Sequence, residues 1–110
     1  MVRGSETGRP IMAALDLLGR RWTLRIMWEL RGGPLGFREL QARCDAMSSS
    51  VLRTRLLELV EEGLVEQDEA GYGLTSIGAE LGAAIEPLSA WAKRWRDPRP
   101  ARRRTPRGGV

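Results

Sequence analysis

The sequence predicts a mainly helical domain with a small two-stranded antiparallel sheet. Most apolar residues recur at three- and four-residue spacing, as they do on one face of a helix. Residues 37–75 carry two helical patterns joined by a turn, and two short strand patterns joined by a tight turn follow at once. This order of elements is typical of a winged helix-turn-helix, in which the hairpin is the wing.

The first helix is expected to begin at Pro10, whose fixed φ suits a first helical turn, and to end at Gly19. Ile11, Leu15 and Leu18 lie on one face of this helix, because they recur at helical spacing. They predict an apolar stripe on a short helix.

A second helix is expected from Trp22 to Arg31. Its apolar residues lie almost all round, so it should be the most buried helix of the domain. The sequence Gly-Gly-Pro at 32–34 ends it. Phe37 and Leu40 then anchor a short third helix over residues 38–43.

The fourth helix is expected to begin after Ser48, which suits an N-cap, and to end at Gly63. Its inward stripe consists of Leu52, Leu56, Leu59 and Leu64. Polar residues gather at its start and on the opposite side, with Ser50, Thr54 and Leu57 pointing outward and Arg53 on the flank.

Two short strands follow, at residues 64–68 and 72–74, joined by Glu69-Ala70-Gly71. The acidic side chains of Asp68 and Glu69 would repel phosphate. We therefore expect this wing to contact a nucleic acid less than the fourth helix does.

The last helix is expected to be capped by Thr75 and bent at Pro87, which cannot donate a helical hydrogen bond. Its long apolar stripe is Ile77, Leu81, Ala84, Ile85, Leu88, Ala92 and Trp95. A small domain has little left to cover such a stripe, which predicts a homodimer formed with the first helix. The expected interface is Ile11, Leu15, Leu18, Leu81, Ile85, Leu88, Trp91 and Trp95.

Composition excludes several classes of site. The 110 residues include one cysteine, Cys44, and no histidine, which rules out an internal disulfide, histidine catalysis and metal sites rich in Cys or His. The carboxylates are scattered over helix faces, so we expect no catalytic residues, no metal and no cofactor. No apolar run is long enough to cross a bilayer and no signal-peptide pattern begins the chain, so we expect a cytoplasmic protein.

The net charge of +4 is unevenly distributed. From Lys93 onward there are eight basic residues and one acid, which leaves a balance of −3 over residues 1–92. We expect a flexible segment at 1–8, one domain at 9–96 and a disordered basic tail at 97–110. The tail could bind phosphates without reading sequence, or it could serve only as a solvating segment.

The amino-acid sequences of several segments resemble those of one protein family. ALDLLGRRWTLRIMWEL at 14–30 is similar to the opening of the HxlR-type winged-helix regulators, in which Ala-Leu-Asp, two hydrophobic residues and Gly-x-x-Trp-Thr precede an apolar helix. The resemblance continues in GPLGFREL (33–40), SSSVLRTRLLELVEEGLVE (48–66) and YGLTSIGAEL (72–81) and covers residues 9–96. The more distant MarR-type regulators share the wing and the Leu-Thr-x-x-Gly turn, but not the opening.

The resemblance implies a homodimeric bacterial transcription regulator that acts as a repressor, with two recognition helices in successive major grooves of double-stranded DNA. Carried over by position, the DNA-contacting residues are Arg38, Ser48, Ser49, Ser50, Arg53 and Thr54. Many family members have a reactive cysteine directly before the proline of the first helix, where this chain has Arg9. Cys44 lies in the helix-turn-helix turn instead, either as a small buried apolar residue or with a redox role.

Two alternatives stay open. Trp22, Trp28 and Trp91 could line a pocket for a small apolar effector between the second helix and the dimer helices, or the tryptophans could be core and interface anchors. The chain could also be a winged-helix module for protein interaction or nonspecific nucleoprotein assembly, without operator specificity. The negative charge balance of residues 1–92 and the acidic wing are the observations that favour this second function.

Overall fold

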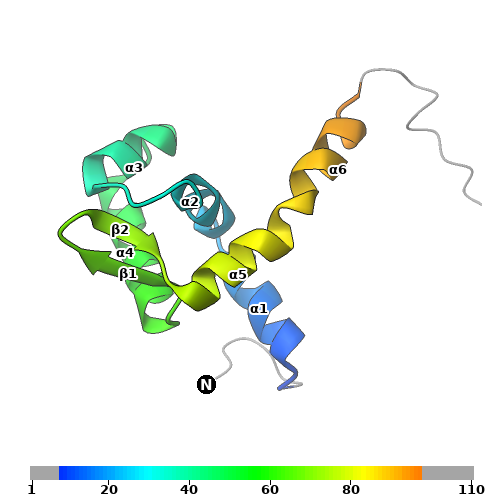
Figure 1. Ribbon diagram of the computed structural model, residues 1–110, viewed down its shortest axis with the longest axis horizontal. Coiled ribbons are helices and arrows are strands. Elements are labelled where there is room, and N and C mark those ends of the chain that lie inside the picture. Colours follow the sequence, from blue (N-terminus) through cyan, green and yellow to red (C-terminus); the bar gives the residue numbers. More distant parts are fainter. Residues whose placement is uncertain (1–7, 98–110) are drawn as a thin grey trace, which may run out of the picture.

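The computed structural model describes residues 8–97, and the expectations for residues 1–7 and 98–110 lie outside this range. The element order is α1 (Pro10–Leu18), α2 (Thr23–Leu30), α3 (Phe37–Arg43), α4 (Ser49–Glu61), β1 (Val65–Asp68), β2 (Gly71–Leu74), α5 (Ser76–Ile85) and α6 (Pro87–Trp95). The expected fold class is confirmed: α3 and α4 form the helix-turn-helix, and β1 and β2 form the wing beside them (Figure 1).

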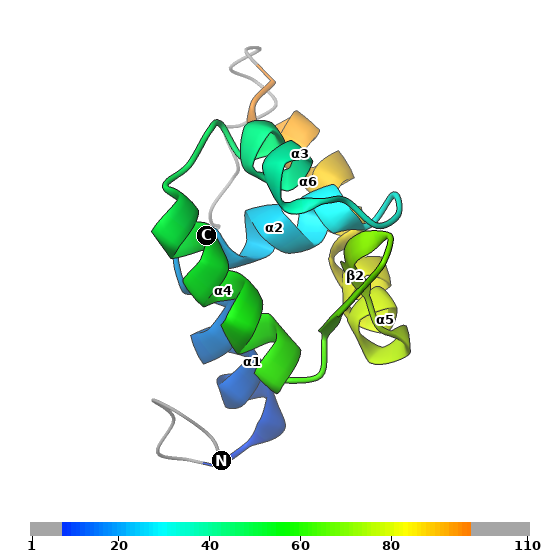
Figure 2. The same cartoon turned by 90° about the vertical axis from the view of Figure 1, so that its left-hand side faces the viewer.

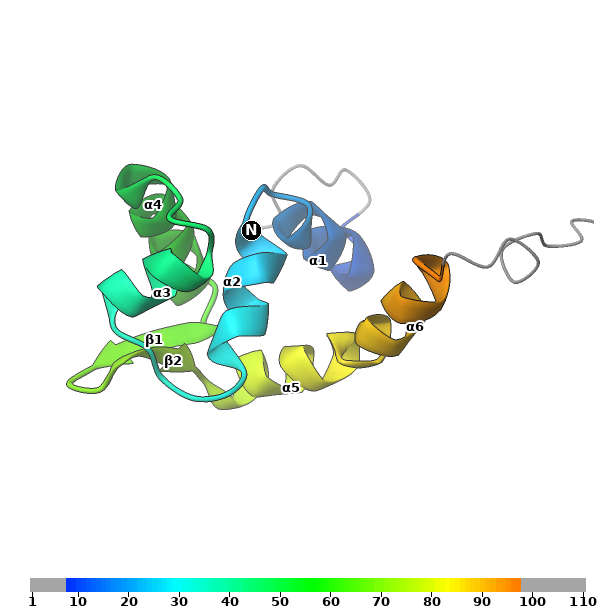
Figure 3. The same ribbon diagram turned by 90° about the horizontal axis from the view of Figure 1, so that it is seen from above.

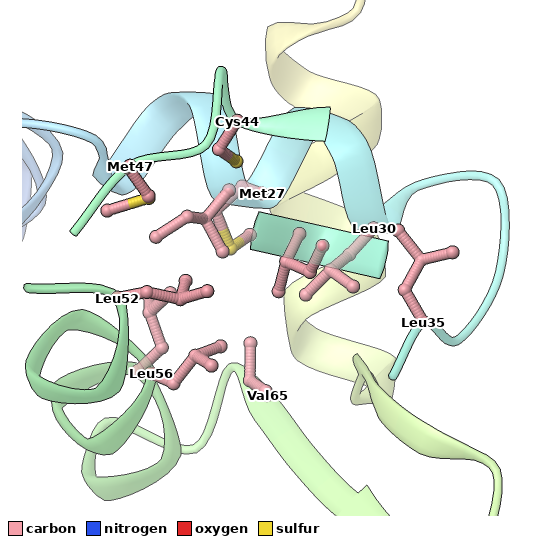
Figure 4. Close-up of a cluster of buried hydrophobic side chains, with 11 residues drawn as sticks. Met27, Leu30, Leu35, Cys44, Met47, Leu52, Leu56 and Val65 are labelled. Carbon is pink, nitrogen blue, oxygen red and sulfur yellow. The ribbon is translucent and has the colours of Figure 1, made fainter. Parts of the chain in front are cut away.

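One hydrophobic core holds α2, α3, α4 and the wing together. Figure 4 shows Met27 of α2 above Leu52 and Leu56 of α4, with Val65 of β1 close by, while Leu30 of α2 lies beside Leu35. The buried apolar side chains are Ile26, Met27, Leu30, Leu35, Leu40, Cys44, Met47, Leu52, Leu56, Leu59 and Val65. Burial of this set stabilises the positions of the three helices relative to one another.

The apolar second helix is the most buried helix of the described chain, as its composition predicted. Thr23, Ile26, Met27 and Leu30 are buried within the eight residues of α2. Trp22 precedes the helix with φ of 76°, a left-handed conformation that a tryptophan rarely adopts. Its side chain packs against the core, which holds the backbone in that conformation.

The start of α4 is capped as expected, because the Ser48 hydroxyl accepts a hydrogen bond from Val51 N at 3.4 Å. Leu52, Leu56 and Leu59 are buried, which confirms the inward stripe. Leu64 lies beyond the helix and is only half-buried, since α4 ends at Glu61 and the chain turns before β1.

The wing is a tight hairpin in which Asp68 pairs with Gly71 and Val65 pairs with Leu74. The pattern predicted the two strands but missed a third partner, Leu35, whose N–H and carbonyl both bond to Tyr72 at 2.9 and 2.8 Å. Gly71 makes this approach possible, because a Cβ there would lie 2.5 Å from the Leu35 carbonyl oxygen. The loop before α3 is thereby attached to the wing.

Thr75 caps α5 as predicted. Its hydroxyl accepts from Gly78 N at 3.1 Å and donates to the Gly63 carbonyl at 2.6 Å. Gly78 lies so close to the preceding chain that a Cβ would be 2.0 Å from the Leu64 carbonyl oxygen. A glycine is required at this point for α5 to pack against the end of the helix-turn-helix.

The last helical segment is two helices, where the pattern predicted one helix bent at Pro87. The α-helical pattern is interrupted at Glu86, between α5 and α6, because Pro87 has no N–H to continue the ladder. Figures 1 and 3 show α5 and α6 extending away from α3, α4 and the wing, with α1 on the same side as α5.

Candidate DNA interface

The exposed side of α4 carries the polar residues that the sequence singled out. Ser48, Ser49, Ser50, Arg53 and Thr54 are all exposed, at the beginning of the helix and on the side away from its buried leucines. Figure 2 shows α3 and α4 turned together toward the viewer. Hydroxyls and a guanidinium on an open helix face can donate to base edges and to phosphates.

Arg53 does not extend freely into solvent. Its guanidinium lies 4.7 Å from the centre of the Phe37 ring, so α3 supports a side chain of α4. Arg38 is exposed on α3 next to Phe37 and makes no ion pair among residues 8–97. Both cations thus stay available to an anionic partner.

Arg55, the third polar residue of the Arg53-Thr54-Arg55 run, points elsewhere. Its Nε donates to the Arg21 carbonyl at 2.8 Å and its Nη1 lies 3.4 Å from Glu58. Arg20 reaches the same carboxylate at 3.0 Å. These contacts tie α4 to the link between α1 and α2, so Arg55 positions the helix and does not share its exposed face.

Sequence reasoning missed Arg25, which reaches from α2 to the α3–α4 turn (residues 44–48). It bonds Glu29 at 2.9 Å and Asp45 at 3.2 Å, and it donates to the Arg43 carbonyl. The hydrogen bond with Glu29 makes the largest contribution to a raised pKa for Arg25. The Arg25–Glu29 spacing signals a helical pair, but no pattern signals the contact with the turn.

Cys44 is fully buried in this turn, which confirms its interpretation as a small apolar residue. Burial raises the pKa of its thiol. A buried thiol with a raised pKa forms little thiolate and so reacts slowly. Arg9 occupies the position at which the resembling family often has a reactive cysteine, and it directly precedes Pro10 at the start of α1.

The two acids of the wing are exposed at its tip. Asp68 Oδ1 accepts a hydrogen bond from Ala70 N at 2.8 Å, so this carboxylate also stabilises the hairpin turn. Glu69 is exposed beside it. The wing tip is therefore negatively charged.

The residues expected at the dimer interface lie on α1, α5 and α6 with large parts uncovered. The exposed fraction is 58% for Ile11, 54% for Leu15, 50% for Leu88, 48% for Trp91 and 50% for Trp95. Leu18, Leu81 and Ile85 are half-buried in the single chain. Trp91 and Trp95 stack on each other with ring centroids 5.3 Å apart. Exposed apolar groups of this size, gathered on the terminal helices, mark an interaction surface.

A cavity of about 560 Å³ opens between α2 and the α5–α6 segment. Its lining residues are Leu24, Arg25, Trp28, Ile85, Leu88, Ser89, Ala92, Lys93 and Arg96. Of the three tryptophans expected in an effector pocket, only Trp28 lines it. Trp22 packs against the core, and Trp91 stacks on Trp95 on α6.

Within residues 8–97, no cluster of three or more Asp, Glu, Cys or His side chains is arranged to hold a metal ion. No helix in the same range is long and apolar enough to cross a membrane.

A protein-family model, that of the HxlR-like helix-turn-helix, matches residues 17–100. The chain belongs to the HxlR-like helix-turn-helix family. Its relatives are named as HTH-type transcriptional regulators. The match therefore supports a DNA-binding transcriptional regulator. The winged-helix interpretation and the resemblance in the sequence are both confirmed.

Relatives and solved structures of this family agree with the match. The chain is 36% identical over 92 residues to the regulator YvaP of Bacillus subtilis. This alignment covers 77% of this chain and 85% of YvaP. It is 35% identical to the quinone-bound YodB of B. subtilis, with a TM-score of 0.70, covering 76% of this chain and 94% of YodB. An HxlR-family factor from Thermoplasma volcanium has a TM-score of 0.68 at 28% identity, covering 77% of this chain and 83% of that factor.

Proposed function

We propose that the protein is a sequence-specific DNA-binding regulator whose helix α4 reads bases in the major groove. The observation that carries the proposal is the polar exposed side of α4, where Ser48–Ser50, Arg53 and Thr54 are open while the leucines opposite are buried. Arg38 on α3 contacts the DNA backbone. Stacking on Phe37 leaves the N–H edges of Arg53 free for a guanine or a phosphate.

The protein acts as a homodimer on a pseudo-palindromic operator. The exposed apolar residues of α1, α5 and α6 support this, because a second copy would cover Ile11, Leu15, Leu88, Trp91 and Trp95 at once. Dimer symmetry then gives two half-sites about one helical turn apart, near 34 Å. A dimer that covers two successive major grooves excludes other proteins from that DNA, so we propose repression.

A small apolar effector is proposed in the cavity between α2 and the α5–α6 segment. The volume of about 560 Å³ suits a small molecule, and Leu24, Trp28 and Leu88 supply apolar walls. The quinone-bound state of YodB, a similar protein, supports an effector of this kind.

The proposal is tested by selecting duplexes from a random library with the full chain, followed by footprinting of the enriched duplex. Enrichment of a pseudo-palindrome with two protected major grooves is the expected result. Equal binding to all duplexes would favour a nonspecific nucleoprotein module. Absence of DNA binding would favour a protein-interaction module.

Arg53→Ala tests the reading residue. If Arg53 contacts a base, the variant loses about 1 to 3 kcal/mol per half-site and relaxes preference at one operator position. If Arg53 holds phosphate, the loss is the same on every sequence. A folded, dimeric variant that protects the enriched duplex with unchanged affinity would show that α4 does not read DNA through Arg53.

A further inference from the structure

The guanidinium of Arg25 uses all three of its nitrogens, and two of them join α2 to the end of α3 and to the α3–α4 turn. Nε donates to Glu29 Oε2 at 2.9 Å, within α2 itself. Nη1 donates to Asp45 Oδ2 at 3.2 Å, and Nη2 donates to the backbone carbonyl of Arg43. A planar guanidinium can reach three separate acceptors in this way, whereas a lysine ammonium cannot span them.

The turn that Arg25 contacts has a strained backbone. Asp45 and Ala46 have φ of 60° and 54°, and neither is a glycine. A left-handed conformation costs roughly 1 to 2 kcal/mol for each L-residue, so the surroundings must hold it in place. Gln41 contributes from α3, accepting from Ala46 N at 2.9 Å and donating to the Met47 carbonyl at 2.9 Å. The contacts of Arg25 come from a different helix, α2.

The position of the turn decides where α4 begins, because Ser48, the last residue of the turn, caps the helix. We propose that Arg25 is a positioning residue for DNA reading: by holding the α3–α4 turn against α2, it sets the position of the first turn of α4. This inference rests on the proposed function. The Arg25 side chain is 38% exposed and that of Asp45 is 70% exposed, so these ion pairs contribute little to folding stability.

Arg25 also lines the cavity between α2 and the α5–α6 segment. A molecule bound there next to Trp28 touches the same side chain that holds the turn. Displacing the Arg25 guanidinium from Asp45 would release the strained turn and move the start of α4. The cavity and the DNA-reading helix are thus connected through one residue.

The test uses the full chain and a duplex that the wild-type protein has enriched from a random library. Arg25→Ala removes the guanidinium, and Arg25→Lys keeps the charge but cannot reach all three acceptors. Arg31→Ala is the matched control, because Arg31 is a surface arginine at the C-cap of α2, 39% exposed, and contacts Glu86 and Trp28 instead of the turn.

Both Arg25 variants should lose about tenfold or more in affinity for the enriched duplex, comparable to one good base contact. Affinity for an unrelated duplex and the dependence of log K on log salt should stay unchanged, since no phosphate contact is removed. Their melting temperatures should match that of Arg31→Ala, whose affinity should equal the wild type.

Two results would overturn the inference. If Arg25→Lys kept full affinity, charge alone would explain the effect. If both variants weakened binding equally on all duplexes with a smaller salt slope, Arg25 would be a phosphate contact. Failure of the library to yield any enriched duplex would instead contradict the proposed function, and it would appear before any variant is made.

A double-mutant cycle gives an independent measurement. Asp45→Asn keeps a residue that tolerates the left-handed backbone but weakens the partner of Arg25. It should reduce affinity for the enriched duplex in the wild-type background and have no further effect in Arg25→Ala. Additive losses would show that the two side chains act separately and would overturn the inference.

Discussion

The Arg53 guanidinium lies over the Phe37 ring, 4.7 Å from the ring centre, so a residue of α3 holds the exposed cation of α4. This contact favours one orientation of the side chain before any partner is bound. An arginine ordered in advance loses less conformational entropy when it forms a hydrogen bond.

Phe37→Leu is therefore expected to weaken binding to the enriched duplex several-fold, because a cation–π contact at an exposed site contributes about 0.5 to 1 kcal/mol. Phe37→Tyr keeps the aromatic face and should bind like the wild type. Affinities are measured by fluorescence anisotropy. In the Arg53→Ala background Phe37→Leu should have no further effect on binding, and an equal loss there would show that Phe37 acts through the core instead.

Replacement of Leu88 and Trp95 together by glutamate should convert the proposed dimer into monomers, since both side chains are half-exposed and apolar on α6. Light scattering on the purified protein measures the mass. Leu57→Glu is the matched control, because Leu57 is 60% exposed but lies on α4. A soluble double variant that stays dimeric would remove the proposed interface.

Gly78→Ala should lower the free energy of unfolding by about 1 to 3 kcal/mol or more, because its Cβ would lie 2.0 Å from the Leu64 carbonyl oxygen. Gly82→Ala in the same helix is the control. Its Cβ would lie 3.7 Å from Leu74 Cδ1, an ordinary contact, and alanine favours a helix by about 0.5 to 1 kcal/mol. Urea unfolding compares the two, and equal stability of both variants would contradict the packing of α5 against Leu64.

Because the thiol of Cys44 is buried, the free energy of unfolding should depend on pH in the alkaline range. Burial raises its pKa above the ordinary value of 9.0, so the unfolded chain loses the proton at lower pH than the folded one. The stabilisation of the neutral thiol is fully present below about pH 9 and is lost as the pH rises through the raised folded pKa.

Cys44→Ala removes this contribution. The difference in unfolding free energy between wild type and variant should therefore shrink as the pH is raised from 8 to 10. The native wild-type thiol should also react slowly with a thiol reagent and react fast in denaturant. Rapid labelling of the folded protein would contradict the burial of Cys44.

Deletion of residues 98–110 tests the basic tail, which carries five arginines. We expect weaker binding to all duplexes alike and a flatter dependence of log K on log salt, because fewer phosphates are neutralised. A full-length chain with these arginines replaced by glutamine separates charge from length. If the truncated chain kept both its affinity and its salt slope, the tail would be a passive solubilising segment.

Local features of the fold followed from the sequence because their causes are local. Helical spacing of Leu52, Leu56 and Leu59 identified the buried side of α4, and Ser48 and Thr75 identified two helix starts. The sequence motifs within residues 14–81 identified the family. The exposed polar residues of α4 follow from the same periodicity, since whatever lies opposite a buried stripe is open.

Contacts between distant segments were decided only by the tertiary structure. No spacing relates Arg25 to Asp45, or Leu35 to Tyr72, because these pairs meet only when α2, α3 and the wing have packed. The same applies to the cavity beside Trp28, because its walls come from α2 and from the α5–α6 segment, which are far apart in the sequence. Of the three tryptophans expected at that site only Trp28 lines it, since an aromatic side chain can pack in a core, in a stack or in a cavity wall, and composition does not distinguish these places.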